Sequence, residues 1–207
     1  NTPILQDSIT ADLKQVVFVF TTMWGVKGVV KLIRDYKGTQ HIPWKALEGD
    51  IRDSVDSNLE RDIAMSFDGV APFFPMEKKG LKSWLQVEME RLSQDNAEDG
   101  LWKRLEVTSQ VLDLLVTSDF IDYADLTSKN KDFSYSFSNF GVKELQNGPF
   151  KRLRSHVTQC FVEKRSQHVA KVTLGDDGRT VVSDWCTAIE NSQEFECEQA
   201  CRHKTLI

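Results

Sequence analysis

The stretch Phe133-Ser-Tyr-Ser-Phe-Ser-Asn-Phe-Gly141 is the part of the chain that most directly indicates its fold. Aromatic side chains alternate with serines here, and this period of two is typical of a half-buried β-strand. Ser134, Ser136 and Ser138 then lie on one face, because strand side chains repeat every two residues. The end at 139–141 has the composition of a tight turn. We therefore expect a strand with three hydroxyl donors on one face, which can point into a cleft. A donor that is fixed in place there can stabilise an oxyanion.

Strand patterns continue toward the C-terminus. Two β-branched runs flank the sequence Gly-Asp-Asp-Gly, which is typical of a β-hairpin. A turn, one further strand and a short acidic helix complete this third of the chain. The predicted elements are a turn at 147–149, strands at 155–162, 169–174 and 180–185, a hairpin loop at 175–178 and a helix at 192–200.

The first two thirds of the chain are mainly helical in pattern. A clear apolar face at helical spacing predicts a central helix at 81–92, and a second helical run follows at 101–115 with an interruption at Thr108. The remaining predictions are a buried strand or buried helix at 16–22, helices at 29–36 and 44–59, a strand at 62–67, an irregular segment at 71–75 and a loop at 119–131. This order places the chain in the α/β class, as a single domain over residues 1–207.

Composition excludes several classes of function. The 207 residues carry 26 Lys and Arg against 31 Asp and Glu, a net charge of −5. This acidic balance, without a basic stripe, argues against a nucleic-acid partner. The most apolar stretch, 16–30, contains Thr, Gly and Lys, so it does not predict a membrane span. The chain shows no signal peptide and begins Asn1-Thr-Pro3 without Met, so we expect a processed chain or one piece of a longer polypeptide.

Four cysteines are too few for a disulfide framework in a chain of this length. Cys160 stands apart, whereas Cys186, Cys197 and Cys201 with His203 have the composition of a Cys₃His zinc set. The spacing lacks a C-x-x-C knuckle, so free thiols are the simpler interpretation and no metal site is assigned. A reducing compartment is the corresponding expectation, and we predict a cytoplasmic location.

The segment Ser136–Gly141 resembles the S/T-x-S-N-L-G strand of the chloramphenicol-acetyltransferase-like superfamily, which includes dihydrolipoyl acyltransferases, alcohol acetyltransferases and condensation domains. The order downstream is similar to that of the C-terminal lobe of such enzymes, with a Gly-Pro-Phe turn at 148–150, a strand, a hairpin at 172–179 and a helix. The resemblance covers about residues 130–190. It implies a two-layer α/β sandwich, a mixed β-sheet with helices on one face.

The resemblance also implies an activity, that of one lobe of an acyl-CoA-dependent acyltransferase. In that family a His in an H-x-x-x-D motif removes a proton from the acceptor, which then attacks the thioester of the acyl-CoA co-substrate. By its motif position, Ser136 would stabilise the tetrahedral oxyanion. Ser134, Ser138 and Asn139 would bind substrate. The expected substrate is a small molecule with a hydroxyl or amine acceptor, and no further cofactor is implied.

The general base is missing from this sequence. None of the four histidines is followed by Asp at the fourth position, and Gly178 stands where the His of a D-H-R turn would be. The resemblance therefore implies a second chain or segment that carries the N-terminal lobe and its His. The alternative is a non-catalytic α/β binding module for a protein partner or a small apolar ligand. Loss of the base and the richness in aromatic residues both favour that alternative.

Overall fold

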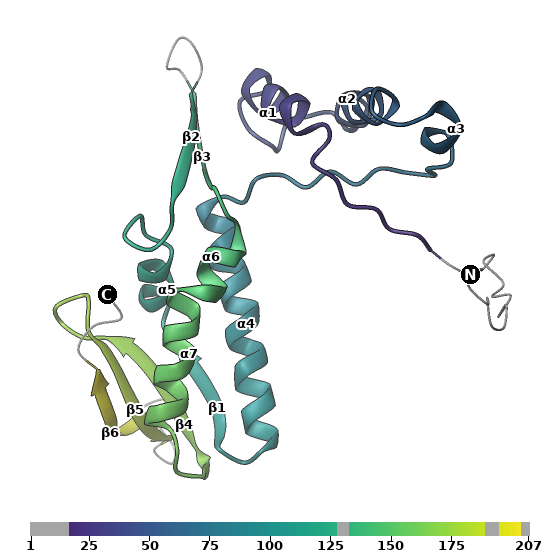
Figure 1. Cartoon of the computed structure of the whole chain (residues 1–207). Coiled ribbons are helices and arrows are strands. Elements are labelled where there is room, and N and C mark those ends of the chain that lie inside the picture. The colour runs from purple at the N-terminus through teal and green to yellow at the C-terminus, as the bar shows by residue number, and fades with distance from the viewer. Residues whose placement is uncertain (1–16, 128–132, 189–194, 204–207) are drawn as a thin grey trace, which may run out of the picture. The chain divides into compact units, whose positions relative to one another are not determined.

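The computed structural model describes residues 17–127, 133–188 and 195–203 (Figure 1). The chain divides into two compact units, residues 1–33 with 42–72 and residues 34–41 with 73–207. The single domain expected over residues 1–207 stays a prediction. Among the described residues, no helix combines the length and the apolar character that crossing a bilayer requires.

The first unit consists of short helices. Their bounds are α1 Val26–Asp35, of which the last two residues belong to the second unit, α2 Trp44–Asp56 and α3 Arg61–Ala64. The apolar side chains buried in this unit are Val29, Leu32, Ile33, Leu47, Ile51, Val55 and Ala64. Helices α1 and α2 approach closely at Gly28, where a Cβ atom would lie 3.2 Å from the Cβ of Asp50.

In its described residues, the second unit contains a four-stranded sheet, a two-stranded sheet and the four helices α4 to α7. The helices are α4 Lys78–Glu98, α5 Ser109–Leu115, α6 Val142–Asn147 and α7 Pro149–Cys160. The strands are β1 Trp102–Val107, β2 Tyr123–Thr127, β3 Ser134–Ser138, β4 Arg165–Leu174, β5 Val181–Ala188 and β6 Phe195–His203. This arrangement confirms the predicted α/β class.

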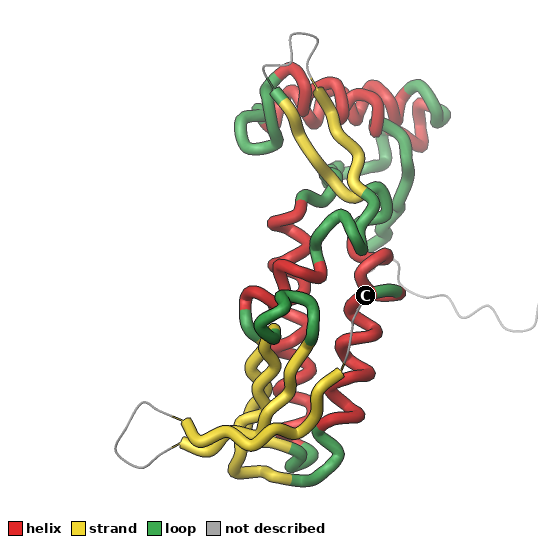
Figure 2. Tube along the Cα trace, turned by 90° about the vertical axis from the view of Figure 1, so that its left-hand side faces the viewer, coloured by secondary structure: helices red, strands yellow, loops and turns green. Residues whose placement is uncertain are grey.

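The large sheet is mixed and has helices on one face. Its strand order is β1-β4-β5-β6, with β1 parallel to β4 and the other neighbours antiparallel. Figures 1 and 2 show α4 and α7 along the same side of this sheet. The two-layer sandwich that the sequence led us to expect is therefore present. The smaller sheet pairs β2 with β3 and extends away from the four-stranded sheet.

Aromatic side chains join the helical layer to the sheet. The Phe161 ring, just beyond α7, packs edge-on against Trp102 of β1 at 6.0 Å and against Trp185 of β5 at 4.7 Å. Trp84 of α4 packs against Phe150 of α7 at 5.3 Å. Large buried rings stabilise a core through their area and through this edge-to-face geometry. These contacts fix the helices on the sheet.

Several predicted elements are confirmed. Helices α1, α2 and α4 lie where helical periodicity placed them, and β3, β4 and β5 lie where strand periodicity placed them. Gly175–Gly178 forms the predicted hairpin loop.

In the hairpin loop, Asp177 accepts hydrogen bonds from the Thr180 hydroxyl and from the backbone N–H groups of Arg179 and Thr180. These hydrogen bonds lower the pKa of its carboxyl to about 2.

Two helix predictions were wrong because strand pairing outweighs local periodicity. Residues 102–107 are not helical but form β1, whose partner β4 lies far along the chain. Thr108 is the N-cap of the shorter helix α5, which explains the interruption in the apolar pattern. The acidic helix expected at 192–200 is strand β6 from Phe195 onward, and residues 192–194 lie outside the described part. Local propensity is a weak prior that tertiary pairing overrides.

The strand and loop predictions also contain errors. Residues 155–160, expected in a strand, belong to α7, where Leu153, His156 and Val157 are buried at helical spacing. The strand expected at 62–67 is wrong, because the short helix α3 satisfies its backbone locally. Residues 17–22 have no regular structure, and their apolar side chains are exposed rather than buried. Part of the expected loop at 119–131 is strand β2, which pairs with β3.

The helix α4 offers a matched test of the core. Leu85 is fully buried (0% exposed) and Val87, on the same helix, is 60% exposed. We expect Leu85→Ala to lower the free energy of unfolding by about 2–5 kcal/mol, because it removes apolar contacts and leaves a cavity. Val87→Ala should change it by less than about 0.5 kcal/mol. Urea denaturation of both variants measures the difference, and equal effects would contradict the packing of α4 described above.

Candidate functional site

The three predicted serines lie on one face of β3, as expected, but in different environments. In the β2–β3 pairing, Ser134 is opposite Thr127, Ser136 is opposite Asp125 and Ser138 is opposite Tyr123. Ser134 and Ser136 are exposed, whereas Ser138 is only 4% exposed. The three hydroxyls therefore do not form one donor row facing a common cleft.

Ser138 and Asn139 are engaged in the turn that follows β3. The Ser138 hydroxyl donates to the carbonyl of Gly141 at 3.4 Å and accepts from the N–H of Phe140 at 3.3 Å. Asn139 donates its side-chain amide to the carboxylate of Asp122 at 2.8 Å and its backbone N–H to the carbonyl of Asp122 at 3.0 Å. Gly141 has a φ of +57°, a conformation that favours glycine. These contacts give both residues a structural role.

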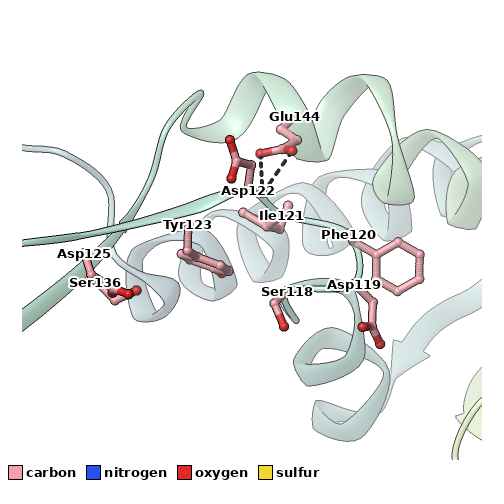
Figure 3. Close-up of a pocket in the computed structure, with 9 residues that line it drawn as sticks. All are labelled: Ser118, Asp119, Phe120, Ile121, Asp122, Tyr123, Asp125, Ser136 and Glu144. Atoms are coloured by element: carbon pink, nitrogen blue, oxygen red, sulfur yellow. Dashed lines mark hydrogen bonds between the residues drawn. The ribbon is translucent and has the colours of Figure 1, made fainter.

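Ser136 lines an open pocket beside the β2–β3 sheet. Figure 3 shows its side chain next to Asp125, on the same face of the sheet. The pocket has a volume of about 640 Å³. Its lining residues are Ser118, Asp119, Phe120, Ile121, Asp122, Tyr123, Asp125, Ser136 and Glu144.

The pocket is strongly acidic, and we call it the acidic pocket for its four carboxylates, Asp119, Asp122, Asp125 and Glu144. No Lys or Arg is among its lining residues. Glu144, on α6, accepts the backbone N–H of Asp122 through both carboxylate oxygens, at 3.0 and 3.1 Å. Asp119 and Asp125 are exposed. The carboxylates of Glu144 and Asp122 thus accept hydrogen bonds within the fold, and the three aspartates Asp119, Asp122 and Asp125 are all exposed.

Tyr123 forms part of the pocket wall without being available as a base. Its hydroxyl donates to the carbonyl of Val116 at 2.8 Å. Burial raises the pKa of Tyr123, and the negative charge of Glu144 raises it further. Its phenol therefore stays protonated at neutral pH and anchors β2 to the end of α5.

No histidine lines the acidic pocket in the part of the chain that the structure describes. His41 is exposed, and the ring of His168 packs edge-on against Trp185 at 6.1 Å. His156 is buried, with its Nε2 atom 2.9 Å from the hydroxyl of Ser183. Ser183 is 0% exposed, so no substrate reaches this Ser–His pair. The pair satisfies polar groups inside the core.

The cysteine prediction was wrong. Cys186 and Cys197 form a disulfide, and Cys160 is disulfide-bonded as well. These three sulfurs are not the free thiols that the sequence led us to expect. Two donors of the Cys₃His zinc set are used in the disulfide, and the side chains of Cys201 and His203 lie outside the described part of the structure. Disulfides of this kind are characteristic of oxidising compartments.

Sequence reasoning missed the acids of the pocket. Asp119, Asp122 and Asp125 recur every third residue, but they fall in the segment that was expected to be a loop. Glu144 joins them only because α6 packs next to the start of β2. The spacing of the three aspartates was the available signal. Comparison with family models, curated proteins and solved structures finds no match to this chain.

The different environments of Ser136 and Asn139 predict different effects on stability. Asn139→Ala should lower the free energy of unfolding by about 1 kcal/mol, because it removes the hydrogen bond to the Asp122 carboxylate. Ser136→Ala should leave it unchanged within about 0.5 kcal/mol, since the side chain is exposed. Thermal or urea denaturation of the two variants measures both values. A larger loss for Ser136→Ala than for Asn139→Ala would contradict the assigned roles.

Proposed function

We propose that the unit formed by residues 34–41 and 73–207 is a non-catalytic binding module whose acidic pocket takes a cationic group from a protein partner. The observation that carries this proposal is the set of four carboxylates around one open pocket, with no cation among its lining residues. Opposite charges at such a site add to attraction and orientation during association. A lysine or arginine side chain of a partner has the matching charge and reach.

The lining supports a cationic ligand over an apolar one. Sites for small apolar ligands are mostly hydrophobic and enclose most of the ligand surface. Here the apolar lining is limited to Phe120, Ile121 and the ring of Tyr123, and the pocket is open. Of the two ligands considered for a binding module, the protein partner therefore agrees better with the geometry than the small apolar molecule.

The test uses an oligolysine peptide as the probe and an oligoglutamate peptide as its control. We expect oligolysine to bind, to shift the backbone amide resonances of Asp125 and Ser136, and to lose affinity as salt screens the charges. The double variant Asp119→Asn, Asp125→Asn should weaken binding at least fivefold. The matched variant Glu90→Gln, Asp95→Asn removes two charges from exposed positions of α4 and should weaken it less than twofold. Equal weakening by both would overturn the proposal.

A second candidate is the acyltransferase lobe that the sequence resemblance implies. The observation in its favour is the position of Ser136, whose exposed hydroxyl lies in the acidic pocket and is free of the turn contacts that engage Ser138. The open side of the pocket leaves room for a second chain or segment to supply the general base. A protonated amine acceptor would agree with the carboxylates better than a neutral hydroxyl acceptor.

Electrostatics weigh against an oxyanion role for Ser136. Asp125 is its direct partner across the β2–β3 pairing. A negative charge developing on a substrate oxygen that accepts a hydrogen bond from Ser136 would be repelled by this carboxylate, whereas oxyanion sites place donors and positive charge near that oxygen. For this reason we rank the binding module first.

Acetyl-CoA distinguishes the two candidates. If the acyltransferase proposal holds, we expect acetyl-CoA to shift the amide resonances of Ser136 and Asp125, and Ser136→Ala to weaken binding while Ser134→Ala, on the same face of β3, does not. If the acidic pocket binds only cations, the phosphates of CoA are repelled and these resonances do not move. That result, together with binding of oligolysine, would reject the acyltransferase lobe and retain the binding module.

The disulfides bear on location. Cytosolic proteins rarely keep structural disulfides, because cellular thiols reduce them. From the Cys186–Cys197 bond and the bonded state of Cys160 we infer an oxidising compartment in place of the predicted cytoplasm.

A further inference from the structure

The Cys186–Cys197 disulfide joins strands β5 and β6, and its two cysteines differ strongly in solvent exposure. Cys186 lies in β5, inside the sheet, and is 1% exposed, whereas Cys197 lies directly opposite in β6 and is exposed. Strand β6 is at the end of the strand order. One sulfur of the bond therefore belongs to a buried residue and the other to an exposed residue at the sheet edge.

A register shift divides the β5–β6 pairing into two parts, and the disulfide lies in the part that contains residues 195–199. The register shifts between Ser183 and Asp184, so that residues 195–199 pair with residues 184–188 on one side of the irregularity. An irregularity of this kind interrupts the ladder locally. This irregularity divides residues 195–199, which we call the edge segment, from the rest of the β5–β6 pairing.

One charge contact also holds the edge segment. Glu198 accepts a hydrogen bond from Arg165 at 2.9 Å, and the Arg165 guanidinium lies 5.4 Å from the centre of the Trp185 ring. Glu198 is directly opposite Trp185 in the register. An exposed ion pair contributes little to stability. The Cys186–Cys197 bond, in contrast, links the edge segment to β5 covalently.

We propose that Cys197 is a site of thiol–disulfide exchange with a small thiol of the glutathione class, and that exchange there releases the edge segment. The thiolate attacks the sulfur of Cys197 and forms a mixed disulfide, while the sulfur of Cys186 leaves with the bonding electrons and takes up a proton. A second thiolate then attacks the external sulfur of the mixed disulfide. This step frees Cys197 as a thiol and yields the oxidised dimer of the small thiol, so two electrons pass from two thiols to the protein.

The small thiolate is expected to attack Cys197 because this cysteine is more accessible to solvent than Cys186. Exchange requires the thiolate to approach the disulfide sulfur, and its rate depends on which sulfur is reachable. Cys186 is covered, while Cys197 is exposed on an edge strand. Cys160, a half-buried residue at the end of α7 that packs against the core, provides an internal comparison in the same chain.

The first experiment treats the folded full-length chain with reduced glutathione, quenches it with an alkylating reagent and identifies the modified peptides by mass spectrometry. We expect Cys186 and Cys197 to become alkylated at least tenfold faster than Cys160, and any glutathione adduct to lie on Cys197. Equal rates at all three cysteines, or an adduct mainly on Cys186, would overturn the proposal.

A matched pair of variants distinguishes the effect of solvent access at each cysteine from the stability of the Cys186–Cys197 disulfide. Cys186→Ser and Cys197→Ser each remove the same disulfide and leave one of its two cysteines. With oxidised glutathione, Cys197 in the first variant should react at least tenfold faster than Cys186 in the second. Equal rates would show that access does not direct the exchange.

Hydrogen exchange tests the release of the edge segment. After mild reduction we expect faster exchange of backbone amides in residues 195–199 and in the facing part of β5, with unchanged exchange in β1 and α4 as internal controls. Faster exchange throughout the unit would mean that the bond supports the whole fold, and no change in the edge segment would mean that the bond does not hold it. Either result would overturn the release.

Discussion

The parallel pairing of β1 with β4 is the constraint on which the second unit depends. Parallel neighbours cannot be joined by a tight turn and need a crossover connection. Here the crossover contains α5, the β2–β3 sheet, α6 and α7. Every residue of the acidic pocket, from Ser118 to Glu144, lies within it. The pocket is thus built on the connection that the central pairing requires, while the sheet supplies the stable base.

Asp122 is the centre of the pocket's internal contacts. Its N–H is bound by Glu144 of α6, and its carboxylate and carbonyl accept from Asn139 at the end of β3. Three segments of the crossover therefore meet at one residue. The carboxylates of Asp122 and Glu144 accept hydrogen bonds that hold these segments together, and Asp119, Asp122 and Asp125 are exposed. This division explains how a concentration of negative charge is tolerated, because half of it is stabilised by hydrogen bonds.

The opposite end of the unit is organised around the edge of the large sheet. Edge strands carry unpaired backbone groups, and proteins limit their exposure with charges and irregularities. Strand β6 has Glu196 and Glu198 in its exposed part, an irregular register with β5 and a disulfide to Cys186. The same features that protect the edge also place Cys197 at the surface. Protection of this edge and the proposed exchange at Cys197 therefore depend on the same structural features.

The sequence alone was enough to predict the elements whose side-chain pattern is local. The apolar face of α4, the alternation in β3 and the Gly-Asp-Asp-Gly hairpin were predicted correctly, since helix and strand periods and turn composition are properties of neighbouring residues. The α/β class followed from their order. The sequence also identified Ser136 as a candidate, and the structure places its side chain in a pocket.

The other features depend on tertiary contacts. Strand β1 exists because β4, far along the chain, pairs with it, whereas β2 and β6 pair with their chain neighbours β3 and β5. In each case a short polar or mixed sequence does not reveal the pairing. Burial separated Ser138 from Ser136, although both lie on one face of β3. The acids around Ser136 and the bond between Cys186 and Cys197 likewise come from segments brought together in space. A pattern of residue types predicts local geometry, whereas charge clustering, exposure and disulfide pairing depend on how separate elements pack against one another.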